Sequence, residues 1–201
     1  SFGFGGSAMF QASEIQRNPG GQTFIVTKDG EPVPAEFKLR VPGKFNIANA
    51  LAAIAAADAL GADMEKIAAS LAEFSGLWRR QEVLGEKNGA IIVSDYGHHP
   101  TEITAAIQAM RDFYPGRRLV WVFQPHQHNR TKKLFNQFIK SFGGVDILLV
   151  ADIFDVPGRE QTEDQDINSK ILAEKISQIS PNVEVRYSGD LANTKKMVRE
   201  I

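Results

Sequence analysis

The feature that most constrains the fold is an alternation of apolar and amphipathic segments that begins near residue 90 and continues through the rest of the sequence. Each apolar run has the length of one strand, and a loop and a longer segment with helical spacing follow it. Continuous apolar strands separated by helices are typical of a parallel sheet covered on both faces. We therefore predict an α/β, doubly wound domain with a mainly parallel sheet. The predicted strands and the helices that follow them are 90–93 and 100–114, 119–123 and 131–142, 147–151 and 167–179, and 183–187 and 191–201.

The preceding part of the chain has a different pattern. Residues 1–21 show no sustained period, whereas 23–27 and 36–41 alternate apolar and polar side chains around Asp29-Gly30. Alternation on both sides of a turn signal predicts a β-hairpin or two short antiparallel strands.

Two helices are predicted after this hairpin. An alanine-rich stretch of high helix propensity follows Gly43 and stops at Gly61. Asp63 is suited to cap a second helix. Both segments carry apolar stripes at helical spacing, so we expect an antiparallel helix pair that closes a partial α/β segment. The stripes are Ile47, Leu51, Ile54 and Ala55, and Met64, Ile67, Leu71 and Phe74.

Composition excludes several classes of function. Basic and acidic side chains number 23 and 24, for a formal net charge of −1, so we expect no nucleic-acid partner. The absence of cysteine excludes disulfides, thiolate metal sites and cysteine nucleophiles. No apolar run approaches the ~20 residues that span a bilayer, and residues 1–7 lack the features of a signal peptide. We expect a cytoplasmic protein without a membrane partner, and the sequence leaves its oligomeric state open.

All four histidines fall in two of the predicted strand-to-helix loops. In a parallel sheet these loops share one edge, where ligands bind in doubly wound folds. For any one histidine, an exposed loop position explains it equally well, with His99 near a helix cap and Pro100 in the first turn. The loop at 152–160 carries four charges, which a solvated loop also explains. The histidines are His98 and His99 after the first strand, and His126 and His128 after the second.

Three further features carry polar chemistry. Asp95 follows its strand directly, where a carboxylate can accept two ribose hydroxyls, hold a divalent ion, or only cap a turn. Arg79 and Arg80 lie on the connector between the two predicted domains, where they could bind phosphate or could simply be surface arginines. Asn46 and Asn49 share one side of a helix start, for hydrogen bonding to a ligand or for capping.

These residues leave three classes of function open. Asn46, Arg80 and Asp95 favour a nucleotide-binding module or a nucleotide-dependent enzyme, although no phosphate loop of the G-x-x-x-x-G-K-S/T type occurs. A metal-dependent hydrolase is the other class, and metal retained after purification would distinguish it. Its ligands would come from His98, His99, His126, His128 and Asp95.

Four motifs together resemble the Mur ligase family. They are Gly43-Lys-Phe-Asn46-Ile-Ala-Asn49, Leu77-Trp-Arg79-Arg80, Asp95-Tyr-Gly-His98-His99-Pro-Thr-Glu102, and Phe123-Gln-Pro-His126 followed by Arg130-Thr131. The resemblance implies that residues 1–77 are the end of the family's central ATPase domain. It implies that 78–201 are most of the C-terminal, Rossmann-like domain that receives the amino acid. A chain of this kind would be a fragment, inactive by itself.

Within the family, the motifs at 95–102 and 123–126 are similar to those of the branch that joins L-alanine to UDP-N-acetylmuramate. The resemblance implies that ATP phosphorylates the muramoyl carboxylate and that the amine of L-alanine attacks the acyl phosphate, while Mg²⁺ holds the phosphates. A family member that recycles murein tripeptide onto the same nucleotide sugar is the alternative. The preference among alanine, glycine and serine stays open.

The resemblance also implies roles for individual residues. Asn46 and Asn49 would hydrogen-bond adenine, Arg80 would contact the phosphates, Asp95 would hold the ribose, and Tyr96 would pack near the nucleotide. No side chain is expected to ligate a metal. The site where the muramoyl nucleotide and alanine meet would be lined by His98, His99, His126 and Arg130. The expected catalytic set is Arg80, Asp95 and His98.

Three positions depart from the family's usual motifs. Phe45 stands where histidine is usual, Ser94 replaces a common aspartate, and Gln127 replaces a frequent arginine. Phe45 is therefore expected to stack rather than to hydrogen-bond, and Gln127 leaves one guanidinium fewer near a substrate carboxylate.

Overall fold

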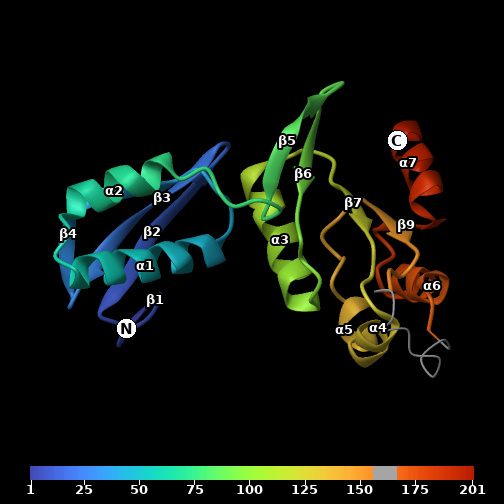
Figure 1. Cartoon of the computed structure of the whole chain (residues 1–201), viewed down its shortest axis with the longest axis horizontal. Helices are drawn as coiled ribbons and strands as arrows, with labels where there is room; N and C mark the ends of the chain where they lie inside the picture. The colour runs from blue at the N-terminus through green and yellow to red at the C-terminus, as the bar shows by residue number, and fades with distance from the viewer. Residues whose placement is uncertain (156–166) are drawn as a thin grey trace. The chain divides into compact units, whose positions relative to one another are not determined.

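The computed structural model describes residues 1–155 and 167–201 (Figure 1). Of the charged loop predicted at 152–160, residues 156–160 lie outside this described part. The chain divides into two compact units, Ser1–Tyr96 with Gln108–Pro115, and Gly97–Ile107 with Gly116–Ile201. No helix in the described ranges is long and apolar enough to cross a membrane.

The first unit contains a four-stranded sheet of order β1-β2-β3-β4. The predicted hairpin is confirmed as the antiparallel pair β3-β4, and its turn places Asp29 and Gly30 at φ 52° and 88°. Two left-handed residues match the twist of the flanking strands. Strand β2 was not predicted, because a register shift between Ser13 and Gln16 interrupts its alternation. The strands are β1 (Phe2–Gly3), β2 (Phe10–Asn18), β3 (Gly21–Lys28) and β4 (Glu31–Leu39).

Two antiparallel helices, α1 (Lys44–Ala59) and α2 (Met64–Glu73), lie along this sheet (Figure 1). The predicted cap is confirmed, since the Asp63 side chain accepts hydrogen bonds from the backbone N–H groups of residues 65 and 66. Three residues of the predicted stripe of α1, Ile47, Leu51 and Ile54, are buried against the strands, and Ala55 is partly buried. The centre of this core is Phe10, Phe24, Phe37, Ile47, Leu51 and Ile54.

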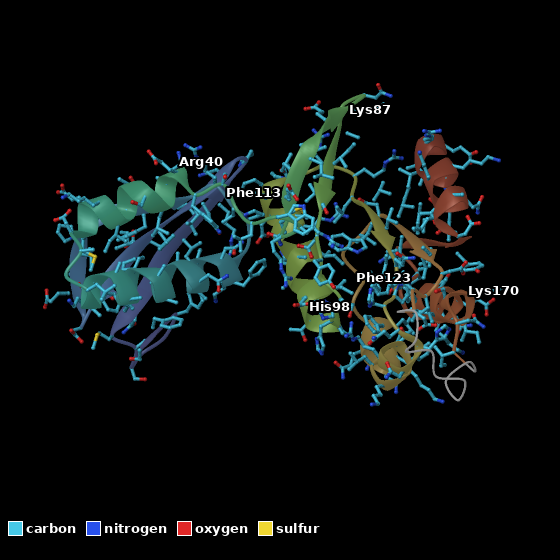
Figure 2. All side chains as sticks on the ribbon, in the orientation of Figure 1. Arg40, Lys87, His98, Phe113, Phe123 and Lys170 are labelled. Atoms are coloured by element: carbon cyan, nitrogen blue, oxygen red, sulfur yellow. The ribbon has the colours of Figure 1, made fainter. Side chains whose placement is uncertain are left out.

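An antiparallel ribbon follows, formed by β5 (Glu82–Lys87) and β6 (Ala90–Ser94). The prediction that 90–93 starts the parallel sheet was wrong, since this strand pairs with β5 instead. The cause is the two-residue turn Asn88-Gly89, whose φ values of 53° and 79° return the chain directly onto β5. Figure 2 shows Lys87 at the tip of this ribbon.

The second unit contains a parallel sheet of order β7-β8-β9 with helices around it. Strand β8 is buried along its whole length, and Leu148 and Val150 pack against α5 and α6. The predicted helix at 131–142 is divided at Leu134 into two short helices. The α/β, mainly parallel fold class is confirmed. The remaining elements of the chain are α3 (Pro100–Phe113), whose residues are divided between the two units, and β7 (Val120–Phe123), α4 (His128–Lys133), α5 (Phe135–Phe138), β8 (Ile147–Ala151), α6 (Ser169–Ile179), β9 (Glu184–Gly189) and α7 (Leu191–Glu200).

Candidate functional site

In the first unit, hydrogen bonds fasten the end of β6 to the connector that precedes β5. Asp95 Oδ2 accepts a bond of 3.0 Å from Gln81 N, and Tyr96 N donates one of 2.8 Å to Arg79 O. Arg79 and Gln81 have φ values of 55° and 51°, so the connector turns sharply on both sides of Arg80. Arg80 is thereby brought close to Asp95 and Tyr96, which follow it in the sequence only after the whole β5-β6 ribbon.

The aromatic ring of Tyr96 lies beneath both guanidinium groups of the connector. The guanidinium carbon of Arg79 is 4.5 Å from the ring centroid, and that of Arg80 is 5.9 Å away. Cation–π attraction of this kind orients long side chains at an exposed surface. Two guanidiniums over the ring of Tyr96, the residue that follows Asp95, match the chemistry of a nucleotide, because arginine binds phosphate oxygens and a carboxylate accepts ribose hydroxyls.

The start of α1 carries the two asparagines. Asn46 Nδ2 donates to Pro42 O at 2.7 Å, and Asn49 Nδ2 donates to Asn46 Oδ1 at 3.3 Å. The amide of Asn46 therefore closes the loop that precedes it. The capping interpretation is wrong for Asn46, because the N-cap of α1 is Gly43 and no side chain of the described residues caps this helix. Asn49 remains exposed beside it. Phe45 is 39% exposed and its ring packs against Gly43, where an added Cβ would lie 2.6 Å from Phe45 Cε1.

In the second unit, His98 and His99 directly precede α3, and Figure 2 labels His98. His99 Nδ1 accepts the backbone N–H of Thr101 at 3.2 Å. Glu102 Oε2 accepts the backbone N–H groups of His98 and His99 at 3.0 and 3.1 Å. With Pro100 at the first helical position, this is a capping box, so the interpretation of His99 as a helix cap is confirmed.

His126 and Arg130 lie at the carboxyl edge of the parallel sheet. The ring of His126 contacts that of Phe154, with centroids 4.9 Å apart. Arg130 is half-buried on α4, and within residues 1–155 and 167–201 its guanidinium has no hydrogen-bond or ion-pair partner. A half-buried guanidinium of this kind is suited to a carboxylate ligand.

The metal-site interpretation has no support in the described part of the chain, which contains no group of three or more His, Asp or Glu side chains that could hold an ion. His128 is engaged with Asp155 instead. The sequence interpretation did not single out Glu102, Gln81 or Asp155. The three-residue spacing from His99 to Glu102 was the available signal for the first.

Two family models match the chain. The model of the Mur ligase, glutamate ligase domain matches residues 79–200, and that of the Mur ligase middle domain matches residues 1–57. The first alone covers more than half of the chain.

Curated relatives and a solved structure agree with these matches. The chain is 40% identical over 188 residues to a UDP-N-acetylmuramate–L-alanine ligase of Desulfitobacterium hafniense, a match that covers 94% of this chain and 41% of that protein. It is 43% identical over 161 residues to the enzyme of the same name from Geotalea daltonii, covering 80% and 34%. The UDP-N-acetylmuramate–alanine ligase MurC of Thermotoga maritima superposes with a TM-score of 0.79 at 25% identity, covering 97% and 40%.

The chain therefore spans 41% or less of the length of these relatives. Its two parts match successive domains of one enzyme family, in the order that the four motifs predict. The chain belongs to the Mur ligase family.

Proposed function

We propose that this chain serves in an ATP-dependent ligase that joins L-alanine to UDP-N-acetylmuramate in peptidoglycan precursor synthesis. The observation that supports it best is the 40% identity, over 94% of the chain, to the UDP-N-acetylmuramate–L-alanine ligase of Desulfitobacterium hafniense. In this proposal residues 1–77 are the end of the ATPase domain and 78–201 belong to the amino-acid-binding domain. ATP and a UDP-linked substrate assign the reaction to the cytoplasm.

The first unit supplies the nucleotide contacts of the proposed enzyme. Arg80 binds phosphate oxygens, Asp95 accepts the ribose hydroxyls, and Tyr96 packs beside the nucleotide. Asn46 and Asn49 hydrogen-bond the adenine from the start of α1. The two guanidiniums held over the ring of Tyr96, together with the neighbouring carboxylate of Asp95, support ATP as the ligand.

Mg²⁺, when bound, neutralises charge on the transferred phosphate. Because the described residues contain no cluster that holds an ion alone, the phosphates are its main ligands in this proposal.

The second unit supplies the contacts to the acceptor substrates. Arg130 pairs with a carboxylate, and His98, His99 and His126 line the substrates. Transfer of phosphate to the muramoyl carboxylate releases ADP, and attack by the amine nitrogen of alanine then forms the amide and releases phosphate and a proton. The side chains act by positioning and charge stabilisation, with Arg80, Asp95 and His98 as the proposed catalytic set.

Calorimetric titration of the 201-residue chain with ADP–Mg²⁺ tests the nucleotide site. We expect binding heat in the wild type, its loss in Asp95→Ala, and its retention in the control Asp63→Ala, which removes a carboxylate that only caps α2. Equal affinity in the wild type and Asp95→Ala would contradict the assignment of Asp95.

Activity of the whole protein tests the reaction. We expect phosphate release from ATP that requires both L-alanine and UDP-N-acetylmuramate. If murein tripeptide replaces L-alanine with higher kcat/KM, the recycling ligase is the correct assignment. If neither acceptor supports turnover, the proposed function is wrong.

A further inference from the structure

Two loops at the carboxyl edge of the parallel sheet are joined, although the loop after β7 and the loop after β8 are 27 residues apart. Gln127 N donates to Phe154 O and Phe154 N donates to Pro125 O, both at 2.8 Å. These two bonds form a short parallel bridge between His126 and Phe154. The backbone that carries His126 is thus held by the loop of the neighbouring strand.

The side chains of His128 and Asp155 make a second connection between the same loops. Asp155 Oδ1 accepts the backbone N–H of His128 at 3.1 Å, and Oδ2 lies 2.5 Å from His128 Nδ1. The two side chains are only 24% and 27% exposed. Because both carboxylate oxygens are used, Asp155 fixes the backbone and the imidazole of His128 together. The proposed roles of the other three histidines leave this one unassigned.

The residue between these connections has a backbone conformation that needs support. Gln127 has φ 69°, which is unfavourable for a residue with a side chain. Its N–H is bonded to Phe154, and its carbonyl oxygen accepts the hydroxyl of the fully buried Thr131 at 2.9 Å. His126 and Arg130 flank this turn, so their directions depend on whether the turn keeps its shape.

Building on the proposed function, we infer that Phe154, Asp155 and His128 form a positioning clamp for the binding of the alanine carboxylate. The clamp holds His126 against Phe154 and fixes the start of the helix that presents Arg130. Without the clamp the turn at Gln127 relaxes, and the guanidinium spends less time in the orientation that meets a carboxylate. Binding of the nucleotide does not involve these residues and stays unchanged.

The kinetic test uses the whole protein with Asp155→Ala, His128→Ala and the double variant. Misplaced binding groups cost up to about 100-fold in rate, so we expect KM for L-alanine to rise on the order of tenfold or more, with KM for ATP unchanged. Because the two residues act as one unit, the double variant is no worse than either single variant. Asp155→Asn recovers part of the loss, since its amide oxygen still accepts the His128 N–H.

The matched control is Tyr187→Phe, which removes a hydrogen bond of 2.6 Å to Asp152 at the same edge of the sheet. This variant is expected to keep the wild-type KM for L-alanine. An unchanged KM for L-alanine in Asp155→Ala, or an equal rise in both KM values, overturns the clamp.

A second readout separates failure of the clamp from failure of the proposed function. If the wild-type whole protein does not use L-alanine, the function fails and the clamp is judged by NMR of the 201-residue chain. Phe154→Leu and Asp155→Ala are expected to shift the ring resonances of His126, and Tyr187→Phe is expected to leave them in place. If the ring resonances of His126 are unchanged in both Phe154→Leu and Asp155→Ala, the clamp is refuted.

Discussion

Replacing Gln81 by methionine is expected to stabilise the first unit. Gln81 is only 8% exposed, and both polar atoms of its side-chain amide are buried without a hydrogen-bond partner in the described structure. An amide buried in this way costs about 1–3 kcal/mol. Methionine has a similar length and removes both polar atoms, while the backbone N–H of residue 81 keeps its bond to Asp95. Gln81→Met should therefore raise the free energy of unfolding by about 1–3 kcal/mol.

The matched control is Gln22→Met, because Gln22 is also buried but its side-chain nitrogen is bonded, and only its Oε1 lacks a partner in the described structure. Its Nε2 donates to Val41 O and Gly43 O at 2.8 and 3.0 Å, so the same substitution leaves two carbonyls without this donor and lowers stability. Urea denaturation measures both changes in the free energy of unfolding. In thermal unfolding, each 1 kcal/mol corresponds to a shift of about 2–4 °C in Tm for a chain of this size. The reasoning is refuted if Gln81→Met is neutral or destabilising, or if the two variants change stability in the same direction.

Three further predictions concern the helix starts and the sheet edge. Removing the cap of α3 in His99→Ala should lower the free energy of unfolding by about 0.5–2 kcal/mol in urea titrations, and His99→Asn should restore most of it; equal losses in both would contradict a capping role. The pKa of the Tyr187 phenol is raised by its hydrogen bond to Asp152, then by burial and by the charges of Asp152 and Asp190. The protonated phenol therefore adds to the free energy of unfolding below its ordinary pKa of about 10, and this contribution is lost as pH rises through the higher pKa of the folded state. In urea titrations, the difference in free energy of unfolding between wild type and Tyr187→Phe should shrink only at alkaline pH. A difference that grows at alkaline pH would contradict this reasoning. Gly43→Ala should cost about 1–3 kcal/mol in thermal unfolding, since residue 43 has φ 94° and the new Cβ meets a neighbouring ring, and a neutral result would show that the backbone relaxes.

Elements whose signals are local could be predicted from the sequence. The apolar run 147–151 is the fully buried β8, and Asp63 caps α2 where the spacing predicts a helix start. Strand β2 could not be predicted, because its bulge breaks the alternation on which strand prediction depends. The pairing of β6 was predicted wrongly because an apolar strand does not specify its partner, and the turn at Asn88-Gly89 decides it.

The same division applies to the candidate site. The interpretation of His99 as a cap needs only the residues next to it, and the structure agrees. The pairing of His128 with Asp155 depends on two strands lying side by side, which periodicity does not determine. Arg80 and Asp95 were singled out by residue type, whereas their proximity arises from the turns of the connector.

The capping box of α3 has a consequence for how the histidine pair could be transplanted. Every bond that defines it is made within the segment His98–Glu102, so the geometry is encoded locally and closes with little loss of chain entropy. We expect that the same five residues, grafted onto the start of an unrelated helix, would place two adjacent imidazoles in the same way. The placement of the two histidines is therefore specified by five consecutive residues rather than by the surrounding fold.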